Sequence, residues 1–225
     1  MASFALPVNE VFETIQGEGF HTGVPAIFVR LQGCDVGCSW CDTKHTWQVL
    51  DSDKVEPELI IGASGDTARW AHLTAVQLLE QFQTLYKAKH VVITGGEPCM
   101  YDLTELSNTL IEAGYSVQIE TSGTYPVKVA NKAWVTVSPK VEMKGGKVVI
   151  EQALHRANEI KHPVARERDL TNLKNLLAGM TKNLDVLVCL QPISQQQRAT
   201  DLCIETCIEN NWRLSLQTHK FIGIE

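Results

Sequence analysis

The sequence has no long hydrophobic run, no excess of basic residues and no low-complexity tract, and each absence excludes a class of protein. Because no stretch approaches about 18 uncharged apolar residues, we expect no membrane-spanning helix and no membrane partner. The chain carries 20 Lys and Arg against 26 Asp and Glu, a net charge of −6, which argues against a broad nucleic-acid-binding surface. Residues 1–12 lack the basic and apolar regions of a signal peptide, so we expect a cytoplasmic protein.

The composition is that of a globular protein, with 44% apolar and 20% charged residues in 225. A chain of this length predicts a single domain over residues 1–225. Its seven cysteines are an odd number, which argues against a disulfide framework and favours metal binding or catalysis. Three of them, Cys34, Cys38 and Cys41, lie within eight residues. The others we expect to be packing residues: Cys99, Cys189, Cys203 and Cys207.

Short apolar runs alternate with segments of helical period, which predicts βαβ units and a parallel sheet. The runs are 26–31, 90–94, 115–120, 134–137, 159–165, 185–190 and 213–216, and the helical segments are 74–89, 103–113, 169–180 and 195–210. Six or seven strands are fewer than the eight of a closed TIM barrel. The prediction is therefore an α/β fold, an incomplete TIM-type β/α barrel.

Two details belong to this prediction. The first helix places Val76, Leu79, Phe82 and Tyr86 on one apolar stripe, and Asp102 with Glu105 predicts a capping box for the second. Residues 44–73 interrupt the strand–helix alternation directly after the clustered cysteines. We expect an insertion that folds over the cysteine loop, residues 33–43.

The spacing Cys34-x3-Cys38-x2-Cys41 follows a predicted strand, and three thiolates so close in sequence can converge on one metal centre. Zinc would need a fourth ligand, and His45 is the nearest candidate, which would make the chain a non-enzymatic zinc-binding protein. An iron–sulfur cluster held by three thiolates keeps one iron open for a ligand or substrate. Barrel-type folds place active sites at the carboxyl ends of their strands, where this cysteine loop begins. This position favours the iron–sulfur cluster over the zinc site.

With Trp40 before Cys41, the cysteine motif resembles the signature of the radical S-adenosylmethionine (SAM) superfamily. That resemblance implies a [4Fe–4S] cluster on Cys34, Cys38 and Cys41 as the catalytic core, with SAM on the fourth iron. The segment Thr94-Gly95-Gly96-Glu97-Pro98 resembles the GGEP element that contacts the amino group of SAM. By the same resemblance the cofactor-binding residues are Trp40, Cys41, Asp42, Gly96, Glu97, Ser138, Pro139, Lys140, Gln191 and Ser194.

Three further features indicate what kind of substrate the site would bind, and each of them also has a purely structural explanation. Gln16 and Glu18 can offer an amide and a carboxylate to a heterocycle with a guanidine-like edge, or belong to a glycine-rich surface loop. Arg30 in a strand can pair with a substrate carboxylate or face solvent. The Thr43 hydroxyl can serve as a hard oxygen ligand of Mg²⁺ or only cap a turn.

With these features the sequence resembles the 7-carboxy-7-deazaguanine synthase family over nearly its full length, including residues 14–19, 164–169, 190–194 and 217–220. The resemblance implies a carbon–nitrogen lyase of queuosine biosynthesis. It would convert 6-carboxy-5,6,7,8-tetrahydropterin into 7-carboxy-7-deazaguanine with loss of ammonia, by hydrogen abstraction from C6 and ring contraction.

The same resemblance implies Mg²⁺ on Thr43, a homodimer, and an electron donor such as flavodoxin or ferredoxin. The implied substrate-binding residues are Ile15, Gln16, Gly17, Glu18, Arg30, Thr94, His219 and Glu225. One alternative shares the cysteine motif: an activase that generates a glycyl radical on a partner protein.

Overall fold

The computed structural model describes residues 4–62, 65, 67–183, 185–193 and 196–224. In these ranges nine strands form one sheet in the order β3-β1-β2-β4-β5-β6-β7-β8-β9. The strands are β1 (Leu6–Ile15), β2 (Pro25–Leu31), β3 (Ala71–Leu73), β4 (His90–Gly95), β5 (Ser116–Thr121), β6 (Trp134–Val137), β7 (Glu159–Val164), β8 (Leu187–Pro192) and β9 (Arg213–Leu214).

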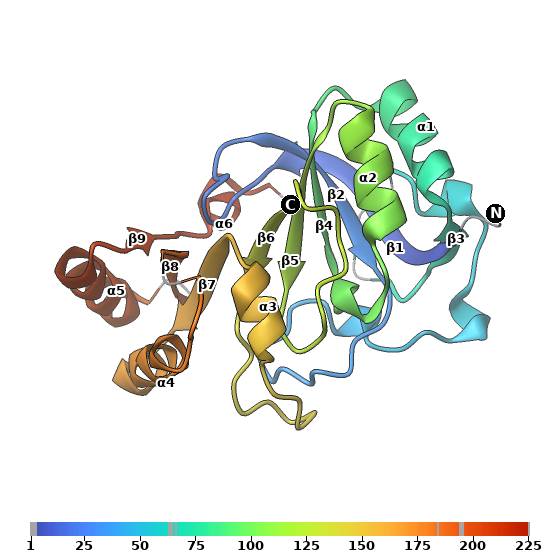
Figure 1. The fold of residues 1–225 in the computed structure, drawn as a ribbon. Helices are drawn as coiled ribbons and strands as arrows, with labels where there is room; N and C mark the ends of the chain where they lie inside the picture. Colours follow the sequence, from blue (N-terminus) through green and yellow to red (C-terminus); the bar gives the residue numbers. More distant parts are fainter. Residues whose placement is uncertain (1–3, 63–64, 66, 184, 194–195, 225) are drawn as a thin grey trace.

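The sheet is parallel from β2 to β9, whereas β1 pairs antiparallel with both β2 and β3. Within the described ranges the edge strands β3 and β9 do not pair with each other, so the barrel stays open (Figure 1). The incomplete β/α barrel predicted from the sequence is confirmed.

The sequence did not predict β1 and β3. In β1 the buried residues run without alternation through its first half and include the polar Asn9 and Glu10. A register shift between Val8 and Glu10 also interrupts its pairing with β2. An irregular strand of this kind loses the period of two by which strands are recognised in sequence.

Helices cover the outer face of the sheet (Figure 1). They are α1 (Ala75–Leu85), α2 (Thr104–Glu112), α3 (Glu151–Arg156), α4 (Glu167–Ala178) and α5 (Gln197–Asn210), followed by the short α6 (Thr218–Ile222). The helices α2 to α5 contact β5, β6, β7 and β8 in turn. The sequence predicted α1, α2, α4 and α5 but neither α3 nor α6. None of the helices in the described ranges combines the length and the hydropathy that crossing a bilayer requires.

Helix starts differ from the predicted pattern. The predicted capping box of Asp102 and Glu105 is wrong, because the N-cap of α2 is Leu103 and Asp102 only accepts a bond from the Thr104 amide. A capping box forms instead at α1, where Thr74 and Gln77 exchange bonds between side chain and backbone.

In its described part, the segment 44–73 holds three short 3₁₀ helices, at Lys44–Thr46, Asp51–Asp53 and Pro57–Leu59, and it ends in β3. The buried Gln32 side chain, at the end of β2, donates to the carbonyls of His45 and Gln48. The segment therefore packs against the beginning of the cysteine loop and extends the sheet by one edge strand.

Candidate active site

A cavity of about 330 Å³ opens at the carboxyl ends of the parallel strands. The cysteine loop contributes Cys34, Cys38, Trp40, Cys41, Asp42 and Thr43 to its wall. Other predicted site residues on the wall come from distant parts of the chain: Glu18, Thr94, Gly96, Glu97, Ser138, Lys140 and Gln191. The fold thus brings most of the predicted cofactor residues and part of the predicted substrate set to one cavity.

The cysteine loop is fixed at its start by backbone hydrogen bonds. Gly33 N donates to Thr46 O at 2.7 Å, and Cys34 N donates to Trp47 O at 3.0 Å. From the β4 loop, Glu97 N donates to Gly33 O at 2.8 Å. A Cβ at Gly96 would lie 2.1 Å from that same Gly33 oxygen. The glycine is therefore required by the close approach of two backbone segments.

The outer side of the loop is held by the segments that follow β5 and β6. The Asp35 carboxylate pairs with Lys147 at 2.8 Å and accepts a bond from the Tyr125 hydroxyl at 2.6 Å. Gly145 N donates to Val36 O at 3.1 Å. The loops that follow β4, β5 and β6 therefore determine where the three thiols lie.

All three thiols of the loop are half-buried. Burial raises the pKa of Cys34 to about 11 and also raises the pKa of Cys38, so both are protonated at neutral pH in the metal-free protein. The Trp47 indole N–H donates to Cys41 Sγ at 3.4 Å. Three thiols on one cavity wall, beside the half-buried cation of Lys140, are a donor set that fits an iron–sulfur cluster, whose iron would displace the thiol protons.

The zinc hypothesis gains nothing from the geometry. His45 lies in the 3₁₀ helix Lys44–Thr46 and is not part of the cavity wall. Within the described ranges, no three His, Cys, Asp or Glu side chains converge as ligands of a single metal ion.

Glu97 is 1% exposed, and its carboxylate binds the loop that follows β5. One oxygen accepts from the Cys99 amide at 2.9 Å and the Thr121 hydroxyl at 2.6 Å. The other accepts from the amide of Ser122 at 2.8 Å and from its hydroxyl. Four donors match the acceptor capacity of a carboxylate, so the side chain fixes the cavity wall.

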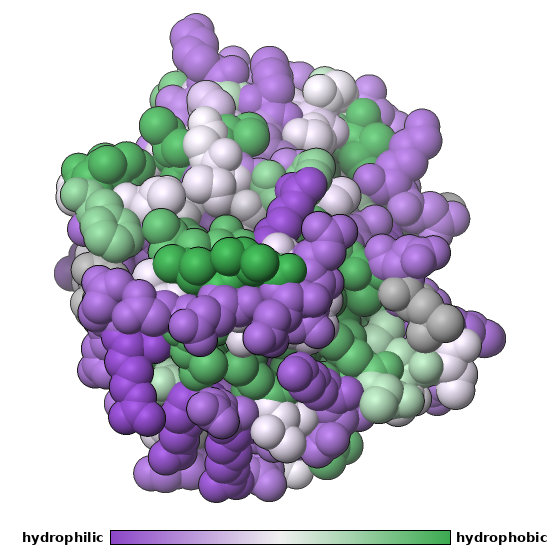
Figure 2. All heavy atoms as spheres, turned by 90° about the vertical axis from the view of Figure 1, so that its left-hand side faces the viewer, coloured by the Kyte–Doolittle hydropathy of each residue, from purple (hydrophilic) through white to green (hydrophobic). Residues whose placement is uncertain are grey.

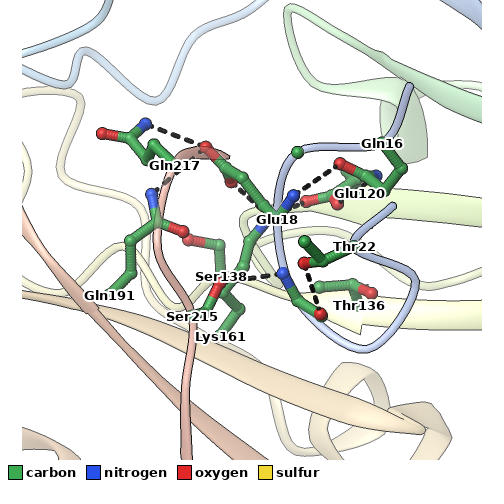
Figure 3. Close-up of polar contacts among 12 residues, drawn as sticks. Gln16, Glu18, Thr22, Glu120, Thr136, Ser138, Lys161, Gln191, Ser215 and Gln217 are labelled. Carbon is green, nitrogen blue, oxygen red and sulfur yellow. Dashed lines mark hydrogen bonds and ion pairs between the residues drawn. The ribbon is translucent and has the colours of Figure 1, made fainter. Parts of the chain in front are cut away.

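Deeper in the cavity, Lys161 of β7 binds two carboxylates (Figure 3). Its ammonium lies 2.7 Å from Glu18 and 2.7 Å from Glu120 of β5. Burial opposes ionisation of Glu18, but the charge and hydrogen bond of Lys161 outweigh it and lower its pKa to about 2. Glu18 is therefore a fixed anion that can accept N–H groups from a ligand.

The comparisons with known proteins agree on one family. The Radical SAM superfamily matches residues 28–137. The chain is 55% identical to the 7-carboxy-7-deazaguanine synthase of Escherichia coli (strain K12), over 97% of this chain and 98% of that protein. This chain belongs to the 7-carboxy-7-deazaguanine synthase family.

Two further comparisons support the assignment. Identity to the 7-carboxy-7-deazaguanine synthase of Buchnera aphidicola subsp. Schizaphis graminum is 44%, over 97% of this chain and 98% of that protein. The crystal structure of QueE from Escherichia coli matches with a TM-score of 0.92 and 54% identity, covering 94% of this chain and 93% of the other. The chain is thus a radical SAM enzyme whose cofactors are a [4Fe–4S] cluster and SAM, which favours neither the activase nor the zinc protein.

Several residues that the family resemblance assigned to substrate or SAM lie beside the cavity instead of on its wall. Arg30 pairs with Glu10 of β1, and Pro139 is buried and not part of the wall to which Ser138 and Lys140 belong. Gln16 is buried, and Ile15 at the end of β1 is exposed. The His219 ring fills the space beside the Gly17 Cα, where a Cβ would lie 2.3 Å from Nδ1. The predicted residues Ser194 and Glu225 lie outside the described residues.

Sequence reasoning missed Lys161 and Trp47, which both line the cavity. Lys161 carries a signal that was available: it is a charged residue inside the apolar run 159–165, where burial requires an ionic partner. Trp47 carries none, because its indole reaches the cavity only through the fold of the segment after the cysteines.

Proposed function

We propose that this chain converts 6-carboxy-5,6,7,8-tetrahydropterin into 7-carboxy-7-deazaguanine with loss of ammonia, a carbon–nitrogen lyase step toward 7-deazapurines such as queuosine. The observation that carries the proposal is the joining, in one cavity, of the three-cysteine loop with the ionised Glu18. The two relatives compared above are both named 7-carboxy-7-deazaguanine synthase, after the product of this reaction.

Cys34, Cys38 and Cys41 would hold the cluster, and SAM would lie against the wall formed by Gly96, Ser138, Lys140 and Gln191, with Trp40 and Asp42 nearby. When bound, the cluster and SAM would supply the radical chemistry that abstracts hydrogen from C6 of the substrate. The protein contributes position and exclusion of water, because loops from several strands enclose the reacting groups.

Glu18 would accept N–H groups of the guanidine-like edge of the pterin, and Thr94 near the end of β4 would add a hydroxyl from the same cavity. Gln16 orients Glu18, because its side-chain oxygen accepts the Glu18 amide at 3.0 Å. Ile15, Gly17 and His219 would shape this loop against α6, where Thr218 N donates to Gly17 O at 2.9 Å. Glu225 remains part of the proposed substrate set.

Arg30 remains the proposed partner of the substrate carboxylate. Its guanidinium already pairs with Glu10, so the two carboxylates would share it. The planar, five-donor guanidinium can serve two acceptors at once. The side-chain exposure of 18% leaves its remaining donors within reach of a ligand.

Thr43 is the proposed protein ligand of Mg²⁺. Its hydroxyl lies on the cavity wall, 3.6 Å from Cys41 Sγ. A single hydroxyl ligand suits Mg²⁺ only where water and substrate oxygens complete the octahedron. Thr43→Ala should therefore weaken the response of the rate to Mg²⁺ without lowering the iron content, and an unaltered Mg²⁺ titration would count against this assignment.

We further propose one domain over residues 1–225, a homodimer and a cytoplasmic location, with a flavodoxin or ferredoxin as electron donor. Support for the dimer comes from exposed apolar side chains. The side chain of Ile208 on α5 is 77% exposed, and those of Phe221 and Ile222 on α6 are each 62% exposed. Figure 2, seen from the α5 side, shows apolar atoms gathered between hydrophilic rows.

The test is an anaerobic incubation of the reconstituted enzyme with dithionite, SAM, Mg²⁺ and 6-carboxy-5,6,7,8-tetrahydropterin, analysed by mass spectrometry. We expect free 7-carboxy-7-deazaguanine to form without any protein partner. A cluster-loaded enzyme that cleaves SAM but leaves the pterin unchanged would contradict the proposal.

A further inference from the structure

Lys161 joins two carboxylates that lie far apart in the sequence. It is 5% exposed, and its ammonium bonds Glu18 in the loop after β1 and Glu120 near the end of β5, each at 2.7 Å. The loop that carries Glu18 lies at the amino-terminal ends of the parallel strands and reaches α6 (Figure 1). Lys161 therefore connects this loop to the sheet.

The oxygens that Lys161 leaves free are used by neutral amides. Glu18 Oε1 accepts from Gln217 at 2.8 Å and from Gln191 at 3.3 Å (Figure 3). Glu120 Oε1 accepts from Gln118 at 3.0 Å and from Gln16 at 3.4 Å. Amides orient the two carboxylates, but they do not compensate their charge.

Among the described residues, the other charged or titratable groups near the pair lie on α6, in the loop after β6 and on β7, and Lys220 of α6 also lines the cavity. His219 of α6 acts on Glu18 electrostatically, but burial lowers its pKa, so it is neutral at physiological pH. Lys140, after β6, acts electrostatically on Cys38 and, less strongly, on Glu120 and Glu18, and it donates to Ser138 at 2.7 Å. Glu159 of β7 lies beyond Glu120 and adds negative charge. Lys161 is thus the cation in direct contact with the pair.

Two buried carboxylates without a cation would hold a proton between them, because like charges in one site cannot both ionise at neutral pH. A protonated Glu18 would lose part of its capacity to accept N–H donors and would present an O–H donor of its own. Even with the lysine present, Glu120 ionises less readily than a free carboxyl group, since burial still raises its pKa.

We propose that Lys161 is a positioning residue for substrate recognition: by bonding Glu18 and Glu120 together, it keeps Glu18 an anion in fixed orientation, ready to accept the N–H edge of the heterocycle. The inference rests on the proposed function, because it assumes a ligand with a guanidine-like edge. It does not require Lys161 to touch the substrate.

The test compares substrate affinity as a function of pH. The variants are Lys161→Met, which removes the charge with little change in length, and Lys161→Arg, which retains it. Lys89→Met is the matched control, because Lys89 lies over the Tyr115 ring, away from the cavity. The dissociation constant for 6-carboxy-5,6,7,8-tetrahydropterin is measured by calorimetry on reconstituted enzyme with SAM and without reductant, between about pH 6 and 9.

We expect wild type, Lys161→Arg and Lys89→Met to bind with an affinity that is flat across this range. Lys161→Met should bind the pterin at least about tenfold more weakly at pH 7, since a protonated Glu18 loses one charge-assisted hydrogen bond to the substrate. Its affinity should recover as the pH rises and the shared proton leaves. Adding Glu120→Gln to Lys161→Met should flatten the profile again, because the repelling carboxylate is then absent.

A Lys161→Met enzyme with a flat pH profile, whatever its absolute affinity, would overturn the proposal. So would an Arg variant with a changed profile. Should the Met variant not fold, the pH profile of Lys161→Gln is measured in its place. A pH-dependent affinity would then support the proposal, and a flat profile would overturn it. SAM affinity, measured in parallel, should stay within about twofold of wild type. Failure of the proposed function would be distinct: wild type itself would then neither bind nor convert the pterin.

Discussion

The two faces of the parallel strands differ in the polarity of their side chains. Outward-facing residues are apolar and join the core under the helices: Val91, Ile93, Val117, Ile119, Val135, Val137, Ile160, Val188 and Leu190. Their neighbours in sequence face the barrel interior and are mostly polar: His90, Thr94, Gln118, Glu120, Thr136, Glu159, Lys161 and Gln191. One set of strands therefore stabilises the protein with one face and builds its site with the other.

The inner face gains little stability from its burial. His90 Nε2 bonds Gln118 Oε1 at 3.0 Å, Gln118 donates to Thr136 at 3.1 Å, and Thr136 donates to Glu159 at 3.2 Å. Such a network mainly offsets the cost of removing polar groups from water, and it specifies one geometry. The outer face, in contrast, stabilises the fold by removing apolar area from water. The two faces should respond differently to substitution.

The largest effect should come from the cavity side. Cys38→Ala removes one of three cluster thiolates, and we expect complete loss of cluster absorption and of SAM cleavage with a melting temperature close to that of the metal-free wild type. Iron analysis and a SAM-cleavage assay measure the outcome. Retained cleavage would refute the role of Cys38.

Next in size is a change at the contact between the two loops. Gly96→Ala places a Cβ 2.1 Å from Gly33 O, so the cysteine loop must shift. A displacement of about 1 Å can cost about 10²-fold in rate, and we expect a loss of that order. Gly179→Ala is the control, because its Cβ would meet nothing closer than 3.5 Å. Equal rates in the two variants would show that the close contact is not required.

On the outer face, Ile119→Ala should destabilise the protein by about 2–5 kcal/mol, because Ile119 is fully buried in the core. The folded fraction should keep wild-type activity per cluster. Val76→Ala on α1 is the comparison, with Val76 52% exposed and an expected change within about 0.5 kcal/mol. Denaturant unfolding measures both, and a similar loss in the two would contradict the position of the core.

The smallest effect concerns His162, which belongs to the outer face of β7. Burial lowers its pKa to about 4, although Nε2 bonds Asp169 O at 3.0 Å. The unfolded chain has a histidine pKa of about 6.5 and binds the proton first, so stability falls as the pH decreases from about 6.5 to about 4. The slope is at most about 1.4 kcal/mol per pH unit.

His162→Gln should reduce that slope. Urea unfolding at about pH 5 and about pH 7 measures it in variant and wild type. An unchanged difference between the two pH values would show that His162 is protonated equally in the folded and unfolded states.

The apolar stripe of α1 shows where sequence patterns reach their limit. The sequence predicted Val76, Leu79, Phe82 and Tyr86 on the buried side, whereas the helix buries Ala75, Leu78 and Phe82. Several neighbouring positions are apolar, so the pattern fits two adjacent faces. Only the packing of the helix on the sheet selects one of them.

The sequence by itself determined the open β/α barrel and the position of the cysteine loop, because strand and helix periods and the spacing of three thiols are local properties. It also indicated Glu18, Thr94, Ser138, Lys140 and Gln191 as site residues, and the structure places them on one cavity wall. Tertiary structure decided the pairings: Arg30 with Glu10, Glu97 with the β5 loop, and Lys161 between Glu18 and Glu120. These contacts join segments 20 to 143 residues apart, and no local pattern encodes which charged groups meet across such distances.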